Sequence, residues 1–185
     1  GFLWVMLLPI LIYAAQSYAF HYILKIEVRN YPIFLLTGLI PWILISSSVE
    51  MSAGSVVNQG GLLKSLPIQP MALIFSQLFD NFINYSVAFF ILIVPIGIYS
   101  DFNLLRLFYV FLPLISALIF IVGFAQIIST LNVFFRDTKF VLSFVLQISY
   151  YLTPIFYPKQ LVPAGLQWYL EINPFYIILS PFQAI

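Results

Sequence analysis

Long uncharged apolar stretches alternate with short polar segments along most of the chain. Five windows contain no Asp, Glu, Lys or Arg, namely residues 1–24, 30–49, 81–100, 107–135 and 140–158. A helix needs about 20 apolar residues to cross the ~30 Å apolar core of a bilayer, and each window has about that length. The pattern predicts an all-α membrane protein with five transmembrane helices in this chain.

Within these windows, we expect the spans at residues 2–23, 33–49, 81–99, 107–130 and 140–157. Residues 50–70 are too polar to cross a bilayer and predict a structured loop with short helices. Residues 71–80 are expected near the membrane interface, because a carboxylate such as Asp80 at the bilayer centre costs about 2.5–3.5 kcal/mol on insertion scales.

The end of the chain is apolar but interrupted by prolines and a glycine, at Pro158, Pro163, Gly165, Pro174 and Pro181. The pieces between them are too short to cross, so we expect short re-entrant or interfacial helices near the C-terminus. The chain also begins and ends inside apolar runs. We therefore expect one transmembrane domain over residues 1–185, a fragment that lacks an N-terminal segment and a last transmembrane helix.

Composition supports lipid as the solvent and limits the possible partners. Charged residues make up 7% of the chain, against about 25% in soluble domains. A net charge of +1 without any Lys/Arg cluster argues against a nucleic acid partner. The basic residues divide almost evenly between the two sets of loops, so they do not fix the orientation in the membrane.

Motifs for catalysis or cofactor binding are weak. The segment Gly60–Ser65 (GGLLKS) lacks the glycine before the lysine and the preceding strand of a phosphate loop, so we predict no ATP site and no other cofactor in this chain. The chain has no cysteine and His21 is its one histidine, which argues against a metal site. The carboxylates are scattered, so we predict that the chain is not an enzyme, although a pair that meets in space stays possible.

An aromatic cluster lies at the end of the last predicted span. It contains Tyr150, Tyr151, Phe156 and Tyr157, and Trp168 comes shortly after them. Aromatic side chains with polar tips can stack on the apolar face of a sugar ring and hydrogen-bond to its hydroxyls. They also form ordinary girdles at membrane interfaces, and the sequence leaves both roles open.

A charged turn, Arg136–Lys139 (RDTK), separates the last two uncharged windows. Exposed ion pairs are weak but common. We therefore expect Arg136 and Asp137 to pair with each other at the membrane edge, with direct contact to a partner protein as the alternative.

Several strings together resemble a known family. They are Leu131–Lys139 (LNVFFRDTK), Tyr151–Pro158 (YLTPIFYP), Val162-Pro163 and Asn173-Pro174, with Gly38–Trp42 and the Asn58–Pro70 loop upstream. This order is similar to that of the ABC-2 type permeases that export O-antigen, teichoic acid and capsular polysaccharide. The resemblance covers essentially the whole chain.

The resemblance implies a multi-pass permease of the bacterial inner membrane, with six helices and an interface helix before the first. Such a permease pairs with a second copy, docks two ATPase subunits that bind the ATP, and moves a lipid-linked glycan through the membrane lipid. The loop after helix two couples to the ATPase, which makes Asn58, Lys64 and Pro67 coupling candidates. Arg136 and Asp137 join them because their polar turn is expected on the same side of the membrane. Helices one and five line the glycan path and short helices near residues 160–184 form a gate, which gives the aromatic cluster that role.

Three other functions stay open. An ABC-2 exporter of drugs or small lipids differs mainly in its substrate. An ion-coupled secondary transporter needs ionisable groups or broken helices near the midplane, often in repeated halves. A membrane-embedded transferase needs histidines or carboxylates clustered on one side.

Overall fold

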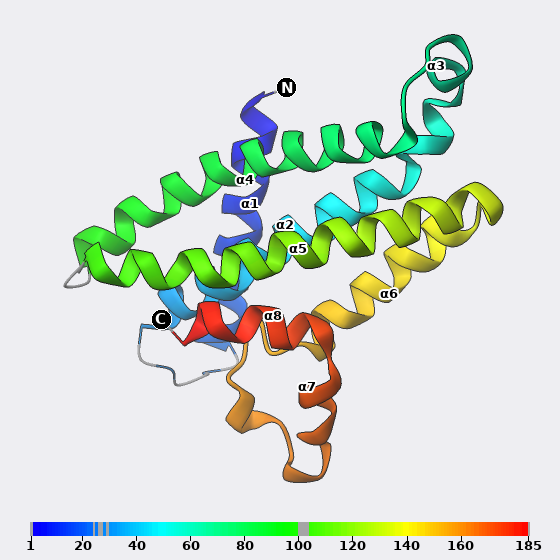
Figure 1. Ribbon diagram of the computed structural model, residues 1–185. Helices are drawn as coiled ribbons and strands as arrows, with labels where there is room; N and C mark the ends of the chain where they lie inside the picture. The colour runs from blue at the N-terminus through cyan, green and yellow to red at the C-terminus, as the bar shows by residue number, and fades with distance from the viewer. Residues whose placement is uncertain (1, 24, 26–27, 29, 100–103, 185) are drawn as a thin grey trace.

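The computed structural model describes residues 2–23, 25, 28, 30–99 and 104–184, and the regular structure in these residues is entirely helical (Figure 1). The all-α prediction is therefore confirmed. The elements are α1 Phe2–Ser17, the π-helix η1 Tyr18–Ile23, α2 Tyr31–Asn58, α3 Gly60–Ser65, α4 Pro70–Tyr99, α5 Leu104–Phe134, α6 Thr138–Leu152, the 3₁₀ turns η2 Lys159–Leu161 and η3 Ala164–Leu166, α7 Trp168–Ile172 and α8 Pro174–Gln183.

Helix α2 is the centre of the fold and contacts α1, α4, α5, α6 and α8. Its buried side chains are spread along its length, from Tyr31 to Ser55. A helix that is apolar on every side is stable when neighbours cover all its faces. The other long helices therefore take their positions from α2.

The pairing of α2 with α5 uses small residues. Ser48 and Ser52 on α2, and Ala125 and Ser129 on α5, are each at most 1% exposed. Small side chains let helix backbones approach closely where lipid supplies no hydrophobic driving force. Near the ends of both helices, the side-chain NH₂ of Asn132 donates to the carbonyl of Ala53 over 2.9 Å. This bond fixes the register of α5 on α2.

Two helices are longer than the sequence predicted. Helix α2 continues to Asn58, so residues 50–58 are not a loop, and α4 begins at Pro70, so residues 71–80 belong to one 30-residue helix. The prediction for residues 50–58 was wrong because polar residues were assumed to be exposed to solvent. Ser52 and Ser55 are buried, and the Ser55 hydroxyl donates to the Ser52 carbonyl within the helix. Pro70 stands at a first helical position, which tolerates proline.

Helix α6 is shorter than predicted. It ends at Leu152 after 15 residues, whereas the sequence suggested a span to residue 157. Pro154 explains the early end, because proline cannot donate to the helix and disfavours helical geometry in the residue before it.

Among the residues whose side chains are described, two helices are long and apolar enough to cross a membrane. They are α2 and the part of α5 from Phe111 to Phe134. The first expected span coincides with α1 and η1, which form one nearly continuous helical stretch. The arrangement of five spans stays a prediction, as does the re-entrant position of the short C-terminal helices.

Candidate functional site

The segment after α6 loses its helical hydrogen bonds and is nevertheless buried. Thr153 and Ile155 are 0% exposed and Phe156 is 5% exposed. A buried carbonyl without a donor is unfavourable, particularly in an apolar environment. The structure must therefore supply donors from elsewhere in the chain.

Each carbonyl from residue 151 to residue 156 accepts a hydrogen bond. The Tyr157 hydroxyl donates to the carbonyls of Tyr151 and Leu152, both at 3.1 Å, and Tyr169 also donates to Leu152. The Ile155 amide donates to Thr153 over 2.7 Å. The remaining three carbonyls are met by side chains distant in sequence: Gln183 Nε2 donates to Pro154 and Ile155 at 2.8 and 3.2 Å, and Tyr31 Oη donates to Phe156 at 2.9 Å.

Asn173 connects this segment to α8. Its Nδ2 donates to Thr153 Oγ1 at 3.1 Å and to Tyr169 Oη at 2.8 Å. Its Oδ1 accepts from the backbone amides of Phe175 and Tyr176, which caps α8. Burial raises the pKa of Tyr169, opposed by its hydrogen bonds with Asn173 and Thr153, so the phenol keeps the proton that it donates to Leu152.

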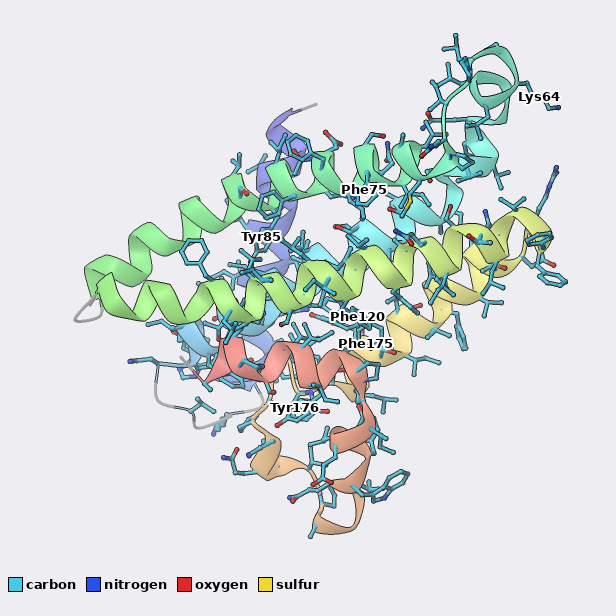
Figure 2. All side chains as sticks on the ribbon, in the orientation of Figure 1. Lys64, Phe75, Tyr85, Phe120, Phe175 and Tyr176 are labelled. Carbon is cyan, nitrogen blue, oxygen red and sulfur yellow. The ribbon has the colours of Figure 1, made fainter. Side chains whose placement is uncertain are left out.

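We call residues 153–183 the C-terminal cap. Helix α2 approaches the cap closely at Gly38, where an added Cβ would lie 2.7 Å from Gln183 Nε2 and 2.8 Å from the Ile155 carbonyl oxygen. Phe175 of α8 packs against Phe120 of α5 and Trp42 of α2, with ring centroids 5.9 and 5.3 Å apart (Figure 2). The motif residues of YLTPIFYP and NP are thus the ones that build the cap.

An open groove of about 520 Å³ lies next to the cap, between α1, α2 and α6. Its walls combine aliphatic, aromatic and polar side chains. They are Ile12, Gln16, Leu39, Trp42, Ile43, Ser46, Glu50, Ser143, Leu146, Gln147, Tyr150 and Tyr151. We call this the α1–α2–α6 groove.

The two ends of the groove differ in chemistry. At the end near the cap, Tyr150 stands between Trp42 and Tyr151, with ring centroids 5.6 and 5.3 Å away, and accepts a hydrogen bond from Gln16 Nε2. At the other end, Ser143 Oγ donates to Glu50 Oε1 over 2.7 Å. The groove therefore offers ring faces at one end and a carboxylate with hydroxyl groups at the other.

The aromatic residues predicted for the glycan path separate into two groups. Tyr150 and Tyr151 line the groove, and Tyr151 is 60% exposed. Phe156 is buried behind them, and its ring centroid lies 4.3 Å from that of Phe20. The Tyr157 hydroxyl donates hydrogen bonds to two carbonyls at the end of α6. Trp168 lies on α7, 60% exposed and outside the groove. Their role in transport stays a prediction.

The residues predicted for coupling belong to segments at the same end of the helical body (Figure 1). Asn58, Lys64, Pro67, Arg136 and Asp137 are all exposed. They lie at the end of α2, on α3 and its following loop, and in the α5–α6 turn, where α3 protrudes from the helical body and Lys64 points outward (Figures 1 and 2). A Cβ added to Gly54 would lie 3.8 Å from Lys139 Nζ, which places the end of α2 beside the start of α6.

The expected ion pair between Arg136 and Asp137 is absent from this described part of the chain. Asp137 stands at the N-cap of α6 in helical backbone geometry, and its side chain makes no capping bond. Neighbouring positions of a helical turn direct their side chains apart, which explains why adjacent opposite charges do not pair here. Both side chains are left on the surface.

Sequence reasoning missed Glu50, Ser143, Gln16 and Trp42 as groove residues. Glu50 was assigned to a loop because it begins the most polar stretch of the chain. The spacing along α2 could have indicated that Glu50 shares a helix face with other groove residues. Those residues are Leu39, Ile43 and Ser46, and the four positions follow one another at spacings of three or four. This pattern becomes informative once α2 is known to continue beyond residue 50.

Comparison with known proteins gives one family. The ABC-2 type transporter family matches residues 1–185. The O-antigen export system permease protein RfbA of Klebsiella pneumoniae is 27% identical over 175 residues, covering 94% of this chain and 68% of the relative. The protein of the same name from Myxococcus xanthus is 26% identical over 187 residues, covering 100% and 72%. The polysialic acid transport protein KpsM of Escherichia coli is 24% identical over 179 residues, covering 94% and 69%. The match spans the whole chain, and the chain belongs to the ABC-2 type transporter family.

Proposed function

We propose that this chain is the transmembrane permease part of an ATP-driven exporter that moves a lipid-linked polysaccharide across the bacterial inner membrane. The observation that carries the proposal is the family match over residues 1–185, together with relatives named as O-antigen export permeases over at least 94% of the chain. The chain contributes the path for the polymer, and the ATP is bound and hydrolysed by a separate subunit.

The geometry of the α1–α2–α6 groove supports a glycan as the substrate. Trp42, Tyr150 and Tyr151 present ring faces on which the C–H face of a sugar can stack. Ser46, Gln147 and Glu50 offer hydrogen-bonding groups to the hydroxyl edges of the same sugar. A drug or a small lipid would need fewer of these polar groups, so the groove favours the glycan.

The proposed topology has five spans in this chain, formed by α1 with η1, α2, α4, α5 and α6, out of six in the complete protein. Helix α6 is about 22 Å long at ~1.5 Å per residue, which is less than the bilayer core. The buried start of the cap, whose carbonyls accept hydrogen bonds, completes that crossing. Irregular backbone is tolerated at membrane depth where protein surrounds it, which fits this role.

In this topology α3 and the α5–α6 turn face the cytoplasm, and the cap faces the opposite side. The five exposed coupling candidates then form the surface that receives the ATPase subunit. A complete exporter contains two permeases and two ATPase subunits, so the α1–α2–α6 groove of each copy contributes to a shared path.

An ion-coupled secondary transporter is the main competitor from another class. Such proteins bind ions with carbonyls freed where a transmembrane helix is broken. The break after α6 is of this kind, but its carbonyls from Tyr151 to Phe156 all accept hydrogen bonds from the protein itself. This feature favours a structural role for the break.

The test uses the full-length protein with an affinity tag, expressed in cells that make a lipid-linked polysaccharide but lack its permease. We expect an ATPase subunit to co-purify and the polymer to reach the cell surface. Replacing the ATPase by a variant that cannot hydrolyse ATP should keep the complex and stop export. Export that continues with that variant, or that follows an ion gradient, would overturn the proposal.

A further inference from the structure

The α1–α2–α6 groove has an unusual charge inventory. Residues 2–23 contain no Asp, Glu, Lys or Arg, and neither does α6 beyond Lys139. Helix α2 contains a single charged residue, Glu50. The groove walls therefore hold one carboxylate and no cationic side chain.

The nearest candidates for a compensating cation lie elsewhere. Lys139 Nζ lies beside Gly54, one helical turn beyond Glu50 on α2, and is not among the groove residues. His21 stacks on Tyr31 with ring centroids 5.6 Å apart and is also outside the groove. Among the described residues, the groove walls themselves carry no cationic side chain.

Glu50 is held in place at the groove wall. Its Oε1 accepts from Ser143 Oγ at 2.7 Å, so the carboxylate spans from α2 to α6. Glu50 lies eight residues before Asn58, which is about 12 Å along α2 at ~1.5 Å per residue, so it stands inside the helical body and not at its exposed end. Glu50 is half-buried, so its charge acts more strongly on a neighbouring charge than it would in open water.

We infer that the groove selects uncharged sugar units and disfavours units that carry a carboxylate or phosphate. The inference rests on the proposed function and names the substrate class for its groove. Sugar hydroxyls can donate to Glu50 while their rings stack on Trp42, Tyr150 and Tyr151. A sugar carboxylate would instead meet Glu50 as a like charge, without a basic side chain to receive it.

The inference separates the relatives by chemistry. A polymer of sialic acid carries a carboxylate on each sugar, which is the kind of unit that Glu50 disfavours. Our proposed substrate is therefore closer to a neutral O-antigen than to an acidic capsule.

The experiment reconstitutes the full-length permease with its ATPase in proteoliposomes and measures the stimulation of ATP hydrolysis by lipid-linked oligosaccharides. The probes are a neutral oligosaccharide, a uronic acid oligosaccharide of the same length, and the methyl ester of the latter, which has nearly the same shape without the charge. For the wild type, we expect the acidic probe to need at least about tenfold more material for half-stimulation than the neutral one, and the ester to behave as neutral.

Two variants assign the effect to Glu50. Glu50→Gln keeps the acceptor for Ser143 and removes the charge, so the tenfold preference should fall to within about twofold. Ser143→Ala keeps the charge and removes the hydrogen bond, so the preference should remain. The wild-type comparison of acid and ester decides the matter even where a variant folds poorly.

The outcomes separate this inference from the proposed function. A wild type stimulated equally by the acidic, neutral and esterified probes would overturn the selectivity and leave polysaccharide export intact. A preference that survives in Glu50→Gln would overturn the role of Glu50. A wild type that responds to none of the probes would overturn both.

Discussion

The two ends of the helical body are built in opposite ways. At the C-terminal cap, polar side chains turn inward and bind backbone, as Tyr31 of α2 and Asn173 and Gln183 of the cap do. At the end formed by α3 and the α5–α6 turn, Lys64, Arg136 and Asp137 turn outward, and their side chains make no hydrogen bond or ion pair within the described residues.

The two ends of the helical body obtain their stability from different sources. The cap is stabilised by hydrogen bonds that replace a turn of helix, so removing one donor leaves an acceptor without a partner. The charged side chains at the exposed end make no such internal hydrogen bonds within the described residues, so they are available to bind another protein. Mutations at the cap should therefore change folding, and mutations at the exposed end should change assembly.

The most severe test of the cap is Gly38→Ala. The added Cβ would lie 2.8 Å from the Ile155 carbonyl oxygen and 2.7 Å from Gln183 Nε2, and the backbone oxygen cannot move freely. We expect a loss of about 1–3 kcal/mol or more in stability, as in other overpacked cores. The measurement is the thermal unfolding midpoint of the full-length protein in detergent.

Gly123→Ala is the matched control, because nothing lies within 4 Å of a Cβ added there. Alanine is also the better helix former by about 1 kcal/mol, so this variant should be at least as stable as the wild type. Equal midpoints for the two variants would show that α2 does not press on the cap as described.

The next largest loss of stability is expected from Asn173→Ala. This change removes the N-cap hydrogen bonding of α8 and two hydrogen bonds between side chains. The cost should be about 1–3 kcal/mol. Asn173→Asp keeps the oxygen that accepts from Phe175 and loses the NH₂ donor, so it should fall between alanine and the wild type. Chemical denaturation of the three proteins gives the order, and an aspartate variant as weak as alanine would contradict the role assigned to the oxygen.

A smaller effect distinguishes the two neighbouring tyrosines. Tyr157→Phe deletes the hydroxyl that donates to two carbonyls and should cost about 1 kcal/mol. Tyr151→Phe should leave stability unchanged, because no hydrogen bond of its hydroxyl is found within the described residues.

Tyr151→Ala should then lower polymer export with stability nearly unchanged, if Tyr151 lines the glycan path. Export and unfolding midpoint are measured on the same preparations. Export at the wild-type rate by Tyr151→Ala would contradict a role in the glycan path and would leave these aromatic residues as a girdle at the membrane interface.

The smallest effect on stability is expected at the exposed end. Arg136→Ala should change the free energy of unfolding by less than about 0.5 kcal/mol, as at most surface sites. It should still weaken retention of the ATPase by up to about 1 kcal/mol, roughly fivefold. Lys159→Ala, an exposed lysine in the cap, is the control and should leave ATPase retention unchanged. The opposite result for the two variants would reverse the proposed orientation.

The sequence predicted the helical class and the places of the long helices, because uncharged windows report which segments avoid water. It misplaced the end of α2 because Ser52 and Ser55 are polar by type but buried by packing against other helices. Local composition does not contain that information.

The site was predicted less completely for a related reason. Tyr150 and Tyr151 belong to a visible aromatic cluster, but their partners Trp42 and Gln16 come from distant helices. The donors Tyr31 and Gln183 reach the segment after α6 across 125 and 28 or more residues of sequence. Such pairings depend on the tertiary fold, so a linear pattern could suggest the importance of YLTPIFYP without giving its hydrogen bonds.

The break after α6 also has a consequence for biosynthesis. The carbonyls of Leu152, Pro154 and Ile155 leave the ribosome before Tyr169 and Gln183, which supply their side-chain donors. The carbonyls of Pro154 and Ile155 therefore lack their Gln183 donor until about thirty further residues have been made and have folded back. The fold of this end of α6 therefore depends on residues that are synthesised after it.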